Sequence, residues 1–123
     1  MKKQNAIAWL PQPEAHDYPA AASYLSLLFD KAEVARLVQR LRKAPVVSFK
    51  AKDVFRASSL SLLGISNSHV EKNRKKIRAG QGLSPLLLVR SQQHGKVIIA
   101  DGYHRLCSVY GFDEDAEIPC KIV

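Results

Sequence analysis

The chain has 123 residues, of which 46% are hydrophobic and 24% are charged, and its formal net charge is +8. This length and composition predict one soluble globular domain with a real hydrophobic core. The apolar run before Pro11 is too short for a signal peptide or a membrane span, so we expect a cytoplasmic protein with no membrane partner. The presence of only two cysteines suits a reduced cytosolic protein better than a disulfide scaffold. Neither they nor the four histidines show zinc-site spacing, so we expect no structural metal.

The positive charge is unevenly distributed along the chain. Residues 36–78 contain twelve Lys or Arg and two acids, whereas residues 101–123 contain five acids and two bases. A basic middle of this kind favours a polyanionic partner, and it is equally typical of a solvated basic face. The composition leaves both interpretations open.

Two helices are predicted at the start of the chain. The first covers residues 17–29, with Asp17 as its N-cap. The second follows Asp30, and Glu33 stands three residues later in a capping-box arrangement. Apolar residues recur at helical spacing in both segments, so we expect a helical hairpin packed on one side of the remaining chain.

A short strand and two more helices are predicted next. Residues 46–50, VVSFK, favour a strand, and Asp53 is the expected N-cap of a short helix after it. SHVE at residues 68–71 is a capping box that opens a basic helix ending at Gly80. Because this helix has only a narrow apolar stripe, we expect it to lie shallowly on the domain.

The last part of the chain predicts a hairpin, a helix and a strand. Residues 85–100 contain two apolar runs around a turn, which is typical of a β-hairpin. The helix expected over residues 102–110 ends at Gly111, a natural C-cap. Apolar residues alternate over residues 118–122, and Pro119 places this final strand near an edge of the sheet.

These elements together predict a single α+β domain over residues 1–123. We expect a small, mixed, mostly antiparallel sheet with surrounding helices. Residues 1–45 form an N-terminal helical extension, and residues 46–123 form the core of the fold.

The run DGYHR, residues 101–105, places a histidine and an arginine where the helix after the buried strand begins. Cations are disfavoured there because the free N–H groups already make that end of a helix positive. The same geometry suits a phosphate or carboxylate, on which the N–H groups and both side chains converge. The alternative is that Asp101 caps the helix and pairs with Arg105, with His104 exposed.

Each residue of this run has a chemical role in an anion site. Arg105 would hold phosphate oxygens with its planar fork, and His104 would donate to a phosphate or move a proton near neutral pH. Gly102 lets the backbone approach the ligand. Asp101 would bind the Mg²⁺ that accompanies a nucleotide, or would activate a hydroxyl group. Asp101 and His104 are therefore the candidate catalytic residues.

From about residue 55 to the last residue, the chain resembles the ParB/sulfiredoxin fold. The matching elements are HVEKNRKKIRAGQGLSP, the hairpin LLLVR–KVIIA, DGYHRLCSVYG and IPCKIV, in the family's order. The segment HDYPAAASYLSLL, residues 16–28, also looks like the start of a group of short bacterial proteins with a DG-x-HR motif. The resemblance implies a cleft for a nucleotide such as ATP, ADP or CTP with Mg²⁺, and it puts Tyr103 and the rest of DGYHR at the phosphates.

The sequence departs from the sulfiredoxins at their catalytic cysteine. Their motif is Gly-Cys-His-Arg, and Tyr103 replaces the cysteine here, so sulfiredoxin chemistry is excluded because the nucleophile is missing. Cys107, one helical turn later, is expected to be a small core residue. The motif is similar instead to the Asp-Gly-x-His-Arg motif of nucleotide-dependent free-serine kinases. Their catalytic glutamate has no identified counterpart, since Glu71 belongs to a predicted cap and Asp53 is the other carboxylate.

The resemblance also implies contacts from two upstream segments. Ser84 lies in GQGLSP, residues 80–85, which matches the loop beside the phosphates, although an ordinary turn explains the same residues equally well. Asn67 and His69 lie at the start of the basic helix, where partition proteins have a nucleotide-contacting segment. His16 is expected to be structural or exposed.

Three functions remain open at this point. The first is a nucleotide- or phosphate-binding domain, which as an enzyme would be a nucleotide-dependent phosphotransferase or NTPase acting on a small hydroxyl substrate. The second is a non-catalytic module that binds nucleic acid non-specifically, or a protein partner, through the basic helix at residues 69–78. The third is a toxin–antitoxin or operon-partner protein whose cleft has lost its ligand.

Overall fold

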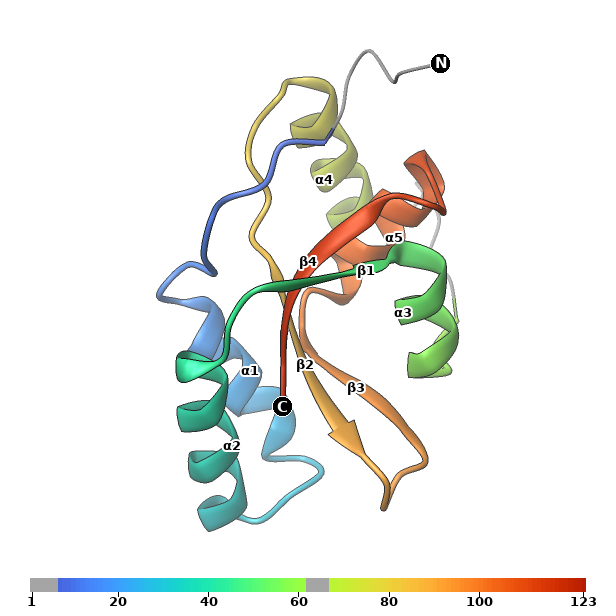
Figure 1. Cartoon of the computed structure of the whole chain (residues 1–123). Helices are drawn as coiled ribbons and strands as arrows, with labels where there is room; N and C mark the ends of the chain where they lie inside the picture. Colours follow the sequence, from blue (N-terminus) through green and yellow to red (C-terminus); the bar gives the residue numbers. More distant parts are fainter. Residues whose placement is uncertain (1–6, 62–66) are drawn as a thin grey trace.

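The computed structural model describes residues 7–61 and 67–123 (Figure 1). The strands in these residues are β1 (Val47–Lys50), β2 (Leu86–Ser91), β3 (Lys96–Asp101) and β4 (Glu117–Ile122). The helices are α1 (Asp17–Leu25), α2 (Lys31–Lys43), α3 (Ala51–Ser58), α4 (Ser68–Arg78) and α5 (Tyr103–Phe112). The strands form one sheet in the order β1-β4-β2-β3. The predicted α+β class with a small, mostly antiparallel sheet is confirmed.

β4 lies inside the sheet and joins its two antiparallel pairs. β1 pairs with β4 and β2 with β3 in antiparallel fashion, whereas β4 runs parallel to β2. The prediction that the last strand lies near an edge is therefore wrong, because β4 has a neighbour on each side. Pro119 is tolerated because it pairs only with Ser48 of β1, and the ladder to β2 begins one residue later, at Cys120.

The sheet separates two hydrophobic clusters, because successive residues of a strand point to opposite faces. Leu86 and Leu88 of β2 belong to the cluster that includes side chains of α3, α4 and α5. Leu87 and Val89 belong to the opposite cluster, which includes side chains of α1 and α2. The predicted helical hairpin therefore covers one face of the sheet, and the other three helices lie on the opposite face (Figure 1).

One predicted helix start is confirmed and another is wrong. Asp30 caps α2, since its Oδ1 accepts from the N–H of Glu33 at 2.8 Å. Asp53, the predicted cap of the next helix, lies instead in the first turn of α3, which begins at Ala51. The chain enters α3 directly from β1, and the N–H of Ala51 donates to the carbonyl of Ala116 at 2.9 Å, so the backbone satisfies this donor without a side-chain cap.

The capping box predicted at residues 68–71 is also wrong, by one residue. Asn67 is the N-cap of α4, and its Oδ1 accepts from the N–H groups of His69 and Val70 at 3.0 and 3.3 Å. Ser68 is already helical. Asn67 is as good a cap as serine, and the sequence pattern alone does not choose between adjacent candidates.

Two helix ends differ from the predictions. α1 ends at Leu25, and residues 26–29 form turns rather than further helix. α5 continues through Gly111 to Phe112, so Gly111 is a helical residue rather than the predicted C-cap. Among the residues that the structure describes, no helix has both the length and the apolar composition needed to cross a bilayer.

Candidate anion-binding site

A polar cavity of about 370 Å³ lies where β3 ends and α5 begins. Its lining contains three histidines, two lysines and one arginine, but a single carboxylate. The lining residues are His16, His69, Lys72, Asn73, Lys76, Asp101, Gly102, Tyr103, His104 and Arg105. The cavity therefore combines the predicted DGYHR run with one face of α4 and with a residue that precedes α1.

The backbone at Gly102 directs the N-terminus of α5 into this cavity. Gly102 has φ of +112°, and a Cβ there would lie 2.7 Å from Cγ of Leu86, so only glycine suits this position. Within the described residues, no side chain caps α5, and the first bond in the helix runs from the N–H of Leu106 to the carbonyl of Gly102. The N–H groups of Tyr103 to Arg105 are thus left without helical acceptors at the positive end of the helix.

Arg105 is held in place but not fully satisfied. Its Nη2 donates to Oδ2 of Asp101 at 3.1 Å and to the carbonyl of Pro85 at 3.4 Å. Its Nε is buried and has no hydrogen-bond partner among the described residues. Asp101 does pair with Arg105, as the alternative interpretation held, but Asp101 does not cap α5. An orphaned buried donor beside an anion-sized cavity is a reason to expect an acceptor there.

Burial shifts the pKa of three groups in the cavity: it raises that of Tyr103, and it also acts on Asp101 and His104. Burial raises the pKa of Asp101, and the Arg105 guanidinium only partly opposes this effect. Burial lowers the pKa of His104, with further contributions from His69 and Arg105. The rings of His69 and His104 lie against each other with centroids 4.8 Å apart. The shifts of Asp101 and His104 both disfavour the charged form in the free protein. A bound anion would act in the opposite direction on His104, because a nearby negative charge favours the imidazolium form.

One face of α4 supplies the remaining cations. His69, Lys72, Asn73 and Lys76 follow the spacing i, i+3, i+4, i+7, so they lie along a single stripe of the helix, which lines the cavity. The sequence shows the spacing of these residues, but it does not show that α4 lies beside α5, so the two lysines were not predicted as members of the DGYHR site.

The other basic residues of α4 lie elsewhere on the helix. Nη2 of Arg78 pairs with Oε2 of Glu71 at 3.3 Å. Arg74 lies against Gly111, near the end of α5. Lys75 is exposed and does not line the cavity. The charges are therefore distributed around α4 rather than gathered on one outer surface.

His16 reaches the cavity because a buried carboxylate fixes the start of α1. Asp17 is 2% exposed, and its Oδ2 accepts from the N–H of Glu14 at 2.9 Å and from the hydroxyl of Ser84. Asp17 is therefore not the predicted N-cap: it is the first helical residue, and its carboxylate is turned toward the interior. Nε2 of His16 lies 3.4 Å from Oδ1 of Asp17. Glu14, His16 and Asp17 have metal-ligating side chains close together, but these bonds give the buried carboxylate a structural role, and we assign no metal there.

The structure brings most of the predicted site residues together and separates two of them. The residues of the DGYHR run and His69 line the cavity. Ser84 does not line it: it is buried, and its hydroxyl is bound to Asp17. Asn67 does not line it either, because its side chain caps α4. Glu71, once expected in that cap, pairs with an arginine of the same helix.

The loop at residues 80–85 is covered by the start of the chain. The N–H of Leu83 donates to the carbonyl of Ala8 at 3.0 Å, and the N–H of Leu10 donates to the carbonyl of Leu83 at 2.8 Å. A Cβ on Gly82 would lie 2.9 Å from Cδ2 of Leu10. The loop that was expected to lie beside the phosphates therefore contacts this chain's own N-terminal segment.

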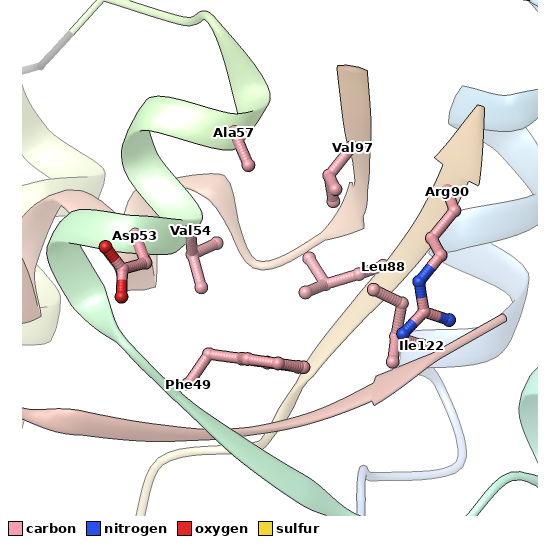
Figure 2. A pocket seen from close by; sticks show the side chains of 8 residues that line it. All are labelled: Phe49, Asp53, Val54, Ala57, Leu88, Arg90, Val97 and Ile122. Atoms are coloured by element: carbon pink, nitrogen blue, oxygen red, sulfur yellow. The ribbon is translucent and has the colours of Figure 1, made fainter. Parts of the chain in front are cut away.

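A second cavity, of about 220 Å³, lies between α3 and the sheet (Figure 2). Apolar side chains form most of its wall, with Asp53 and Arg90 at opposite ends of the view. Oδ1 of Asp53 pairs with Arg56 at 3.2 Å. Asp53, the other carboxylate considered as a base, thus lines a different cavity from Asp101.

The two cysteines lie in the interior and are not joined by a disulfide. Cys107 is 2% exposed and Cys120 is fully buried. Burial raises the pKa of Cys120 to about 12. Cys107 occupies the core position that the sequence predicted.

Comparison of the chain with protein-family models, with curated proteins and with solved structures finds no match in any of the three. The resemblance to the ParB/sulfiredoxin fold therefore stays a prediction. The case for a functional site depends on the geometry of the cavity itself.

Proposed function

We propose that this protein binds the phosphate group of a small molecule in the cavity at the start of α5, with a nucleotide as the ligand that the sequence resemblance suggests. The observation that carries the proposal is the gathering of three histidines, two lysines and Arg105 around one cavity whose described lining has a single carboxylate. Arg105 is also incompletely hydrogen-bonded within the described residues, and phosphate oxygens are strong acceptors with negative charge.

The roles follow from the positions of the groups. The N–H groups at the start of α5 would donate to the anion, and the helix dipole would add to the attraction. Arg105 would donate from its guanidinium to a phosphate oxygen while Asp101 keeps that side chain in place. Lys72 and Lys76 would neutralise charge from the α4 side. His104 would become protonated as the anion binds.

The proposal stops at binding, because the described lining offers little for metal-assisted phosphoryl transfer. Nucleotide-bound Mg²⁺ is usually held by one or two carboxylates together with the phosphates. Asp101 is the single carboxylate of the lining, and Arg105 already engages it. This donor set fits an anion better than a cation, so no reaction step is assigned to Mg²⁺.

A lysine scan along α4 tests the proposal and separates it from binding of nucleic acid. Titration calorimetry would measure the affinity for inorganic phosphate and, separately, for a single-stranded oligonucleotide. Lys72→Ala and Lys76→Ala should each weaken phosphate binding several-fold, whereas Lys75→Ala, a matched change on the same helix outside the cavity, should not.

Two results would count against the proposal. No detectable phosphate binding by the wild-type protein would remove it. Equal losses for all three variants, with oligonucleotide binding that falls steeply with salt, would instead favour the basic helix as a nucleic-acid surface.

A further inference from the structure

A third cavity, mainly apolar, adjoins the polar cavity of the candidate anion-binding site, which is called the cationic cavity below. It has a volume of about 420 Å³ and shares four lining residues with its neighbour: Asp101, Gly102, Tyr103 and His104. Its other lining residues are Ala20, Tyr24, Leu60, Ile99 and Ala100. Four of these five have no polar side-chain atom, so the wall changes from cationic to apolar across the junction of β3 and α5.

Residues of α1 also show the change from a cationic to an apolar wall. His16, just before α1, and Ala20 and Tyr24 within it follow one another at i, i+4 and i+8, so they lie along one side of this helix. His16 lines the cationic cavity, and Ala20 and Tyr24 line the apolar one. The two cavities are therefore bounded by the same helix on one side and by the same four residues of the β3–α5 junction on the other.

Tyr24 is an exposed aromatic side chain that the packing of the fold does not explain. It is 40% exposed, whereas Ala21 and Leu25 of the same helix are fully buried in the cluster under α1 and α2. Its ring thus remains available on the side of α1 that faces the apolar cavity. A ligand group placed there would cover apolar surface that is otherwise in water.

From this arrangement we propose that the ligand is a phosphate monoester of an apolar or aromatic alcohol, rather than the nucleotide that the sequence resemblance suggests, and that its organic group lies in the apolar cavity against Tyr24 and Ala20. This inference rests on the proposed binding of phosphate in the adjoining cavity. Because the wall beyond the shared residues offers mainly carbon atoms, recognition of the organic group depends on its apolar surface rather than on a hydrogen-bond pattern. The affinity gain should then be similar for different aromatic groups.

The experiment compares three probes by titration calorimetry on the full chain: inorganic phosphate, glycerol phosphate and phenyl phosphate. Phenyl phosphate should bind about tenfold more tightly than inorganic phosphate, because one partly buried aromatic contact contributes a free energy of about this size. Glycerol phosphate should bind little more tightly than inorganic phosphate. Tyr24→Ala and Ala20→Phe should remove this gain, the first by deleting a wall and the second by filling the space. Neither should change the affinity for inorganic phosphate.

Ser23→Phe is the matched control, since Ser23 is exposed on the same helix and lines neither cavity. It should leave the tenfold gain intact. If inorganic phosphate binds but phenyl phosphate binds no more tightly, or if the gain survives both cavity variants, the inference is wrong while the proposed function stands. If inorganic phosphate does not bind the wild-type protein, both are wrong.

Discussion

Asp101 and Arg105 form an ion pair one helical turn apart, and the pair lies partly inside the protein. Nη2 of Arg105 is 3.1 Å from Oδ2 of Asp101, and the two side chains are 17% and 19% exposed. The pair occupies one edge of the guanidinium and leaves its buried Nε without a partner among the described residues. Arg105 therefore contributes both to the stability of the fold and to the cavity, and the two contributions can be measured separately.

Arg105→Ala should lower both the phosphate affinity and the free energy of unfolding. Loss of a charged hydrogen bond to phosphate should weaken binding by one to two orders of magnitude, equivalent to roughly 1.5–3 kcal/mol. The unpaired Asp101 carboxylate should cost about 1–3 kcal/mol of stability, because it stays partly buried. Urea unfolding measures the second effect. The double variant with Asp101→Asn should regain much of the lost stability and still not bind, whereas a double variant that binds normally would show that Arg105 does not contact the anion.

Asp101→Asn alone should strengthen phosphate binding about three- to tenfold at neutral pH. It removes the single carboxylate of the described lining, whose charge opposes that of a bound anion at close range. Calorimetry with and without Mg²⁺ decides between this expectation and a metal-binding role. Weaker binding of the variant, confined to the samples with Mg²⁺, would show that Asp101 holds the metal ion of a nucleotide.

Affinity for sulfate, a tetrahedral anion that does not titrate between pH 7.5 and 5.5, should increase as the pH falls over this range, because His104 has a lowered pKa in the free protein and gains a proton when an anion binds. Arg105, Lys72 and Lys76 line the same cavity, and His69 faces His104 from α4. Calorimetry in two buffers of different ionisation enthalpy measures the proton uptake directly. His104→Gln should reduce that uptake, and an unchanged uptake would show that His104 is not the group that gains the proton.

The free protein should lose stability over the same pH range. His104 has a lower pKa in the folded than in the unfolded chain, so its contribution is fully present above the ordinary value of 6.5 and is lost as the pH falls from 6.5 toward the folded-state value. The melting temperature of the wild type should therefore fall more steeply below pH 6.5 than that of His104→Gln. Parallel curves would contradict this.

Gly102→Ala should destabilise the fold by about 2 kcal/mol or more, since it combines an unfavourable φ of +112° with a contact of 2.7 Å to Leu86. Gly95→Ala is the matched control, because φ is +67° there and nothing lies within 4 Å of the added Cβ. Its cost should be about 1 kcal/mol, from the backbone alone. Equal losses in urea unfolding would show that Leu86 moves aside without cost.

The sequence was sufficient to predict structural features that depend only on neighbouring residues. The cap at Asp30, the hairpin and the glycine before α5 all depend on contacts within a few residues. Asp17 and Asp53 show where this reasoning fails. Both are good N-cap residues, but the carboxylate of Asp17 is bound to Ser84 and the start of α3 is satisfied by Ala116, contacts that link distant parts of the chain.

In the candidate site too, residues that are consecutive in the sequence could be predicted, and residues brought in by packing could not. The DGYHR run was visible because its strand, glycine and helix are consecutive. The contributions of His16, Lys72 and Lys76 depend on how α1 and α4 lie beside α5, and this follows from packing on the sheet. Ser84 looked like a site residue because its loop matches, through the sequence resemblance, a loop beside the phosphates, and its role as the partner of a buried carboxylate has no local signature.

The position of α1 and α2 over the sheet also determines whether the chain can be shortened to residues 46–123. Leu87, Val89, Ile98 and Ala100 point into the cluster under these two helices, and none is more than 4% exposed. A fragment of residues 46–123 would present these side chains to water and would lack the carboxylate that binds Ser84. The N-terminal helices are therefore no detachable appendage. They cover one face of the sheet, and any redesign without them needs another cover for that face.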